Sequence, residues 1–116
     1  MIAGTVRPDG VPVVTLSLGG RDWTAIIDTG FSGDLELPTS LRPLVNARFL
    51  GQARSLLAGG QMIIEDIYLV DFPFDGQVVS AEATFVAGSE ILPGTHLMRY
   101  HRLEVWFAAG TVLLER

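Results

Sequence analysis

Short apolar stretches separated by turn residues run through the whole chain. In the segment 11–18, Val14, Leu16 and Leu18 alternate with other residues, which is the pattern of a half-buried strand. A Gly-Gly pair then leads into a second apolar stretch at 23–27, so the first third of the sequence predicts a β-meander. By the same criteria we expect further strands at 2–7, 35–37, 49–57, 62–72, 78–86, 103–107 and 111–114. Strands therefore dominate the predicted fold.

Two short helices are expected to interrupt this series of strands. A Pro-Thr-Ser sequence opens the segment 38–45, where a hydroxyl side chain would cap a helix. A Pro-Gly-Thr sequence begins a second helix over 93–100. No linker or repeat divides the 116 residues, which is an ordinary length for one domain. We expect a single domain over 1–116, mainly β, built as a small, partly closed β-barrel with two short helices.

One carboxylate stands at the end of an apolar strand. Ile26 and Ile27 lead directly into Asp28, and Thr29, Gly30 and then a second glycine follow. Burying an unpaired carboxylate carries a large free-energy penalty, so an acid in this position requires an explanation. Asp and Gly are also ordinary turn residues, and the Asp-Thr-Gly tripeptide alone favours a turn over a site. The segments that follow it reverse this balance.

Two later segments accompany the Asp-Thr-Gly sequence in a fixed order. Leu-Ala-Gly-Gly at 57–60 is the tip of a predicted hairpin, and Ile-Leu-Pro-Gly-Thr at 91–95 leads from an apolar pair through a glycine into a helix. With its closing strands, the chain resembles the retropepsin-like (retroviral-type, clan AA) aspartic peptidases, in particular their single-domain bacterial members. That family carries Asp-Thr/Ser-Gly after an apolar strand, then a flap hairpin, then two apolar residues and a glycine. The resemblance spans most of the chain.

The resemblance implies an aspartic endopeptidase that hydrolyses peptide bonds of an extended polypeptide. Such enzymes need two facing carboxylates, and this chain carries a single Asp-Thr-Gly within a single-domain length. The second carboxylate must come from another copy across a two-fold axis, so a homodimer pairs Asp28 of one copy with Asp28 of the other. Two such carboxylates share a proton and together activate a water molecule, with no metal or other cofactor.

The same resemblance assigns roles to the residues around the dyad. Thr29 would link the two loops across the axis by hydrogen bonds, and Gly30 would let the substrate backbone pass close to the carboxylates. The glycines of the hairpin tip would let it open and close as a flap over the peptide. The residues expected to contact substrate are Phe31, Ser32, Gly33, Ala58, Gly59, Gly60 and Leu92.

Two positions depart from the family pattern and keep other hypotheses open. Phe31 stands where a small residue is usual, and Pro93 stands where a residue with a backbone N–H is usual. A second hypothesis is therefore a catalytically weak or inactive dimeric module that binds peptides or supports assembly. A third is a monomeric β domain in which Asp28 only shapes a turn. The intact Asp-Thr-Gly favours the peptidase.

Four other titratable residues are expected to have structural roles only. Strand alternation predicts that Asp34 and Glu36, which flank the loop, are solvated. His96 and His101 are expected at the surface of the second helix, with His101 near its C-terminal carbonyls.

Composition narrows the class of protein. Hydrophobic residues make up 48% of the chain and charged residues 18%, which indicates either a dense β core or a buried subunit interface. Trp23, Trp106 and Phe107 are expected in one or the other. The absence of cysteine excludes disulfides and thiol chemistry. The net charge of −5, with no lysine, argues against nucleic-acid and anionic-membrane partners.

The location of the protein is predicted from the absence of sorting signals. No apolar run approaches the roughly 20 residues of a membrane span. The first residues lack the basic region and apolar stretch of a secretion signal. We therefore expect a cytoplasmic homodimer that takes a peptide or protein substrate.

Overall fold

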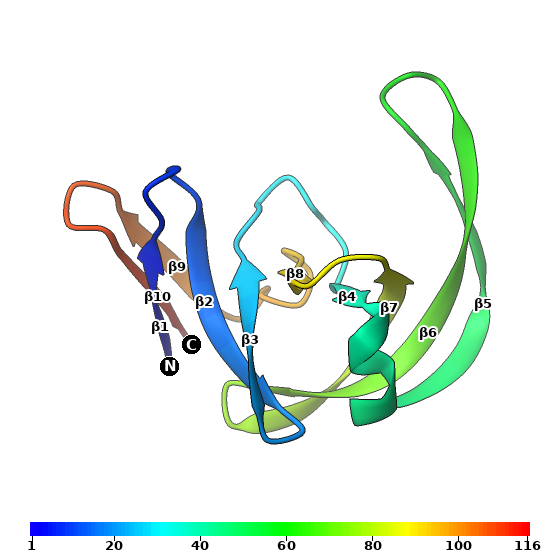
Figure 1. Cartoon of the computed structure of the whole chain (residues 1–116), viewed down its shortest axis with the longest axis horizontal. Helices are drawn as coiled ribbons and strands as arrows, with labels where there is room; N and C mark the ends of the chain where they lie inside the picture. Colours follow the sequence, from blue (N-terminus) through cyan, green and yellow to red (C-terminus); the bar gives the residue numbers. More distant parts are fainter.

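The computed structural model describes all 116 residues and contains ten β-strands and one short 3-10 helix (Figure 1). The strands are β1 (Ile2–Val6), β2 (Pro12–Leu18), β3 (Arg21–Ile26), β4 (Leu35–Pro38), β5 (Asn46–Leu56), β6 (Met62–Phe74), β7 (Gln77–Val86), β8 (Leu92–Pro93), β9 (Arg102–Trp106) and β10 (Thr111–Glu115). The 3-10 helix η1 covers Thr39–Leu44. The expected mainly β fold is confirmed.

One five-stranded sheet combines the two ends of the chain. Its order is β3-β2-β1-β10-β9, and all its pairings are antiparallel. Alternation explains the inner face, because Val14, Leu16 and Leu18 of β2 are buried while the residues between them are exposed. The first and last strands lie side by side, with Ile2 opposite Leu114. Strands β3 and β9 form the free edges of this sheet.

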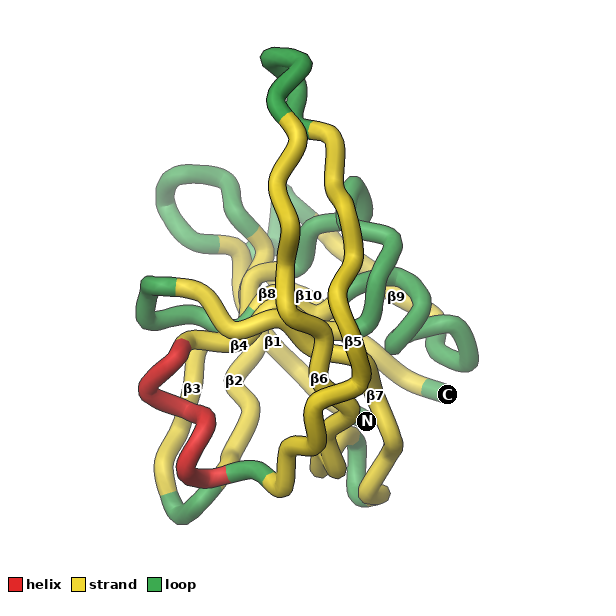
Figure 2. Tube along the Cα trace, turned by 90° about the vertical axis from the view of Figure 1, so that its right-hand side faces the viewer, coloured by secondary structure: helices red, strands yellow, loops and turns green.

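The second five-stranded sheet has the order β5-β6-β7-β4-β8. Its pairings are antiparallel except for β4 and β7, which run parallel. Strands β5 and β6 form a long hairpin with a register shift between Phe49 and Gly51, and the hairpin projects beyond the rest of the molecule (Figures 1 and 2). Its far end, residues 57–61, is called the hairpin tip below.

The core lies between the two sheets and consists only of apolar residues. A single parallel bridge between Ala25 and Ile91 joins the sheets. No polar or charged residue belongs to this core. The core residues are Val14, Leu16, Leu18, Trp23, Ala25, Ile27, Leu35, Leu37, Leu41, Val70, Phe72, Phe74, Ala81, Ala83, Ile91, Leu97, Met98, Val112 and Leu114. No helix in the structure has the length and hydropathy needed to cross a lipid bilayer.

The two expected helices differ from the prediction. The first is the 3-10 helix η1, and no side chain caps it, because Pro38 occupies the N-cap position. The second, expected over 93–100, is a series of turns. Its backbone bonds are irregular: Met98 N donates to Gly94 O at 3.3 Å, but Arg99 N donates to His96 O at 3.3 Å. The mixed spacing breaks the regular α-helical pattern.

Candidate active site

The loop that follows β3 presents Asp28 at the surface. Ile27 is buried, and the chain then leaves the sheet, so Asp28 is exposed directly beside the core. Its Oδ1 accepts a hydrogen bond from Gly30 N at 2.9 Å, and its carbonyl accepts one from Phe31 N at 3.2 Å. A Cβ on Gly30 would lie 3.1 Å from Asp28 Oδ1, closer than ordinary contact. Residues 27–34, called the Asp28 loop below, therefore begin with a tight turn around the carboxylate.

A second segment of the chain fixes the Asp28 loop by backbone hydrogen bonds. Residues 91–96, called the clamp segment below, donate three backbone hydrogen bonds to it. The bonds are Gly94 N to Asp34 O at 2.8 Å, Thr95 N to Phe31 O at 2.9 Å and His96 N to Gly33 O at 3.2 Å. Successive residues of the clamp segment thus fix three positions of the loop.

Gly94 permits this close approach. A Cβ at position 94 would lie only 1.9 Å from the carbonyl oxygen of Gly33, a distance that real side chains do not reach. Its φ is not positive, so the requirement for glycine comes from contact and not from backbone conformation. The glycine of the 91–95 sequence is therefore explained by the packing of two backbones.

The start of the clamp segment also extends the sheet that carries the loop. Ile26 N donates to Ile91 O at 2.9 Å, and Ile91 N donates to Thr24 O at 2.9 Å. Pro93, which lacks an N–H, is buried in β8 opposite Leu35. The backing of β3 therefore relies on Ile91, and the missing donor at Pro93 leaves these bonds intact.

Asp34 differs from the sequence prediction. Its side chain is only 9% exposed and is not solvated. One carboxylate oxygen accepts a hydrogen bond from Glu82 N at 3.0 Å, and the other lies 2.5 Å from His96 Nδ1. Because Glu82 belongs to β7, Asp34 ties the loop to both the second sheet and the clamp segment. Sequence reasoning missed this role because Glu82 is distant along the chain.

The hairpin tip has none of these supports. Its only backbone hydrogen bonds are internal, from Leu57 N to Gln61 O at 2.7 Å and from Gly60 N to Leu57 O at 2.9 Å. Gly60 has a φ of 81°, which favours glycine, and a Cβ on Gly59 would meet no atom within 4 Å. No hydrogen bond joins the tip to the Asp28 loop. Ala58, Gly59 and Gly60 are all exposed.

A pocket of about 200 Å³ lies between the Asp28 loop, strands β4 and β7, and the part of the β5–β6 hairpin nearer its tip. Its lining residues are Phe31, Gly33, Asp34, Leu35, Glu36, Ser55, Glu65, Ile67, Glu82, Ala83 and Thr84. Burial raises the pKa of Glu36, and the negative charge of Glu65 raises it further. Glu36 is therefore partly enclosed and not fully solvated, contrary to the prediction.

The structure brings only some of the predicted contact residues together. Phe31 and Gly33 line this pocket. Thr29 and Ser32 are exposed on the Asp28 loop. Leu92 is half-buried in β8 opposite Glu36 and lines none of the four pockets in the structure.

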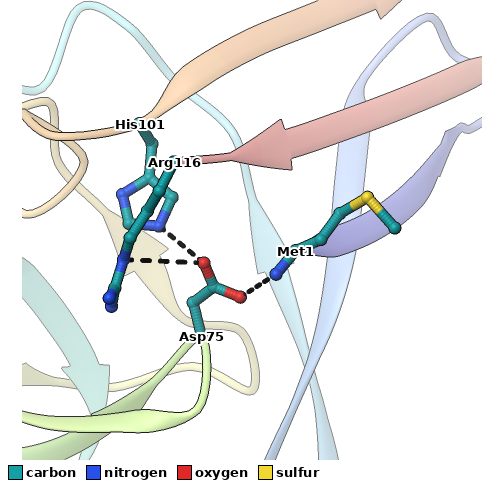
Figure 3. A network of polar contacts seen from close by, with 4 residues as sticks. All are labelled: Met1, Asp75, His101 and Arg116. Carbon is teal, nitrogen blue, oxygen red and sulfur yellow. Dashed lines mark hydrogen bonds and ion pairs between the residues drawn. The ribbon is translucent and has the colours of Figure 1, made fainter.

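The side chain of His101 is buried, contrary to the expected surface position. Its side chain is 3% exposed, and its Nε2 lies 3.0 Å from Asp75 Oδ2 (Figure 3). Asp75 also contacts the N-terminal amine of Met1 and lies 3.7 Å from Arg116 Nε. The hydrogen bond from this amine is the main reason that the pKa of Asp75 is lowered, and His101 lowers it further. This network links the chain ends to the β6–β7 turn.

Comparison with solved structures matches this arrangement to a known architecture. A crystal structure of a retropepsin-like aspartic protease from Rickettsia conorii aligns with a TM-score of 0.67 and 13% sequence identity, over 97% of this chain and 87% of that chain. The fold is retropepsin-like.

A viral protein contains a similar domain. The protease-reverse transcriptase of a foamy virus, solved with an RNA/DNA hybrid, aligns with a TM-score of 0.64 and 15% identity. The match covers 81% of this chain, which spans only 12% of that viral chain. No protein-family model and no curated protein sequence matches. At these identities, the retropepsin-like fold rests on backbone geometry.

Within this retropepsin-like fold, one chain supplies a single accessible carboxylate on the Asp28 loop. The neighbouring acid, Asp34, is enclosed and already accepts a hydrogen bond from Glu82 N. Asp28 has one oxygen bonded to Gly30 N, and the residue remains exposed. A reaction that requires two facing carboxylates would therefore need a second carboxylate from outside the chain.

Proposed function

We propose that this chain is one half of a homodimeric aspartic endopeptidase. The observation that carries the proposal is the exposed Asp28 carboxylate, held at the end of β3 in a loop that the clamp segment fixes, within a retropepsin-like fold. Rigid placement of a reactive group lowers the barrier of the reaction it takes part in. A structural turn alone would not require an accessible carboxylate beside the core.

The proposed mechanism uses Asp28 of both copies. Two carboxylates that face each other cannot both ionise readily, so they hold one proton between them and titrate as a pair. The ionised partner takes a proton from a trapped water, and the protonated partner polarises the carbonyl of the peptide bond. Water adds to the carbonyl carbon, and the tetrahedral intermediate collapses with proton transfer to the leaving nitrogen.

The other predicted residues take supporting roles in this proposal. Thr29 joins the two loops across the axis, and Gly30 admits the substrate backbone. Phe31, Ser32 and Gly33 contact the peptide from the loop, and Leu92 does so from β8. The hairpin tip, with Ala58, Gly59 and Gly60, closes over the peptide as a flap, and the lack of hydrogen bonds between the tip and the loop supports this motion.

One observation favours the alternative of a dimeric peptide-binding or assembly module with little activity. The ring of Phe31 packs so close to Gly33 that a Cβ there would lie 2.9 Å from ring carbons. The ring therefore occupies space beside the loop that a small residue would leave open. The experiment below separates the two functions.

The test compares Asp28→Asn with wild type on a peptide library between about pH 4 and pH 7. We expect wild type to cleave and the variant to lose nearly all cleavage while keeping its fold and its dimer. Asp22→Asn is the matched control, because Asp22 is an exposed acid of the preceding strand, and its activity should equal that of wild type. Equal cleavage by Asp28→Asn, or a strict monomer at micromolar concentration, would contradict the peptidase proposal.

A further inference from the structure

A second pocket, of about 300 Å³, shares only Asp34 with the pocket beside the Asp28 loop. It lies between the end of β6, the first residues of β7, the stretch 97–101 and the side chain of Arg116, which follows β10. Arg99 and Arg116 both line it, and it is called the arginine pocket below. None of the residues assigned above to catalysis or to peptide contact belongs to its walls.

Its charge sets the arginine pocket apart from the other three. Arg99 and Arg116 are opposed by a single carboxylate, that of Asp34. Both oxygens of Asp34 already have partners, in Glu82 N and His96 Nδ1. In each of the other pockets, acidic side chains outnumber basic ones. A chain with a net charge of −5 therefore concentrates positive charge in one pocket.

Uncharged groups hold the side chain of Arg99 in place. Its Nη1 donates a hydrogen bond to the carbonyl of His96 at 2.7 Å. Its guanidinium carbon lies 4.7 Å from the centre of the Tyr100 ring, within the range of a cation–π contact. These contacts orient the guanidinium of Arg99 and leave its charge without a carboxylate partner.

Arg116 and His101 meet at one carboxylate on another wall of the pocket. Arg116 Nε lies 3.7 Å and His101 Nε2 3.0 Å from Asp75 Oδ2, and Asp75 also contacts the amine of Met1 (Figure 3). The contact through Nε leaves both terminal nitrogens of Arg116 without a hydrogen-bond partner. The Nδ1 atom of His101 is buried and has no partner in the chain either. Such an atom is typical of a place where a protein holds a further polar group.

The remaining walls of the arginine pocket are largely apolar. Phe74, Val79 and Leu97 line it, and Ser80 adds one hydroxyl group. Pockets that combine apolar walls with a few charged groups are suited to small organic ligands. Here the ligand needs an anionic end for the arginines and a small apolar body. One surplus positive charge favours a monoanion, because the carboxylate of Asp34 repels a second negative charge.

We propose that the arginine pocket binds a small organic monocarboxylate, with its carboxylate at Arg99 and Arg116 and its apolar group against Phe74 and Val79. Guanidinium groups suit this ligand because their N–H donors match the two oxygens of a carboxylate. The carboxylate belongs either to a free organic acid or to the C-terminus of a peptide. The proposal goes beyond the peptidase function and does not depend on it.

Benzoate is the probe for the charge requirement, and isothermal titration calorimetry measures its binding. We expect benzoate to bind wild type, and benzamide, which has the same shape without the charge, to bind about tenfold or more weakly. Sulfate, a dianion, should also bind more weakly than benzoate. Equal affinity for benzoate and benzamide, or no benzoate binding at up to about 10 mM, would overturn the proposal.

Arginine variants locate the binding site. Arg99→Gln and Arg116→Gln each remove one cation, and each should raise the dissociation constant of benzoate about tenfold or more. Arg116→Lys keeps the charge but loses the paired donors, so its affinity should lie between that of Arg116→Gln and wild type. Arg48→Gln is the matched control, since Arg48 is exposed and lines none of the four pockets.

Circular dichroism checks that each variant is folded. Wild-type affinity in folded Arg99→Gln and Arg116→Gln would show that benzoate binds elsewhere and would reject the site. An equal loss of affinity in Arg48→Gln would reject it as well, because the effect would then follow the net charge of the protein and not the pocket.

Two short peptides distinguish the sources of the carboxylate. One ends in phenylalanine with a free carboxylate, and the other has the same sequence with a C-terminal amide. Displacement of benzoate by the first peptide alone identifies a peptide C-terminus as a ligand, and displacement by neither identifies a free organic acid. Displacement by the amide would contradict the requirement for a carboxylate.

The binding assay is independent of peptide cleavage. Asp28→Asn should bind benzoate with the affinity of wild type, because Asp28 does not line the arginine pocket. Benzoate binding in a protein that never cleaves peptides rejects the peptidase and retains the pocket. Asp28-dependent cleavage in a protein that does not bind benzoate rejects the pocket and retains the peptidase.

Discussion

The Asp28 loop and the hairpin tip are both glycine-containing turns, but only the loop is hydrogen-bonded to other segments of the chain. Three backbone hydrogen bonds from the clamp segment and the carboxylate of Asp34 hold the loop. The tip has only its two internal backbone hydrogen bonds, and a Cβ on Gly59 or Gly60 would meet no atom within 4 Å. The structure therefore combines a firmly held loop that carries Asp28 with a hairpin tip that has few restraints.

The difference also separates two uses of glycine. Gly94 is required because two backbones touch, whereas Gly60 is required because its φ of 81° excludes most side chains. Gly59 meets neither condition. The three experiments below exploit this contrast, beginning with the largest expected effect.

Substitution by alanine of Gly94 in the clamp segment and of Gly59 in the hairpin tip should give the largest difference in stability. In Gly94→Ala, the new Cβ meets the Gly33 carbonyl, so we expect the free energy of unfolding to fall by about 1–3 kcal/mol or more, with loss of any Asp28-dependent cleavage. Gly59→Ala is the matched control and should stay within about 0.5 kcal/mol of wild type. Urea denaturation measures both. Equal stability of the two variants would show that the clamp segment does not hold the loop.

Removal of one carboxylate from the Asp28 loop and of one from the β5–β6 hairpin should give the next largest difference. Asp34→Ala removes both the acceptor of the Glu82 N–H and the partner of His96 Nδ1, so we expect a loss of about 1–3 kcal/mol in the free energy of unfolding. Asp66→Ala on the hairpin removes an exposed contact with Gln52 and should cost less than about 0.5 kcal/mol. Thermal unfolding of the two variants makes the measurement. A larger loss from Asp66→Ala would reverse the assignment of fixed and free regions.

The smallest effect concerns the pocket between the Asp28 loop and the strands of the β5–β6 hairpin. The raised pKa of Glu36 means that the folded state binds this proton more tightly than the unfolded state, whose value is 4.5. Its contribution to stability is therefore full below pH 4.5 and is lost as the pH rises through the raised pKa. Glu36→Gln should unfold at a higher urea concentration than wild type at about pH 7 but not at about pH 4. An advantage that is equal at both pH values would remove the electrostatic explanation.

Much of the scaffold could be predicted because it depends on local pattern. The alternation of Val14, Leu16 and Leu18 predicts a half-buried strand, and the glycine-rich stretch at 57–60 predicts the end of a hairpin. Asp28 could also be singled out, since an acid at the end of an apolar strand is unusual in any fold. Its exposure in the structure is consistent with a site, and its catalytic role stays a prediction.

The contacts that fix the site could not be predicted in the same way. Asp34 is enclosed because Glu82 and His96 are brought to it by the fold, and His101 is buried because it meets Asp75. These partners lie far apart in sequence, and strand alternation carries no information about them. The prediction of a second helix was wrong for a related reason. The backbone N–H groups of Gly94, Thr95 and His96 donate to the Asp28 loop.

The pairing of β1 with β10 bears on the order in which the protein folds. Strand β1 is synthesised before its neighbour β10, and eight other strands lie between them in the sequence. The Asp28 loop likewise waits for the clamp segment, which follows it by more than half of the chain. Such long-range contacts slow folding, because loop closure must precede the stabilising interactions. The Asp28 carboxylate is thus held in place only after the clamp segment has been synthesised, so the loop becomes fixed after most of the strands around it exist.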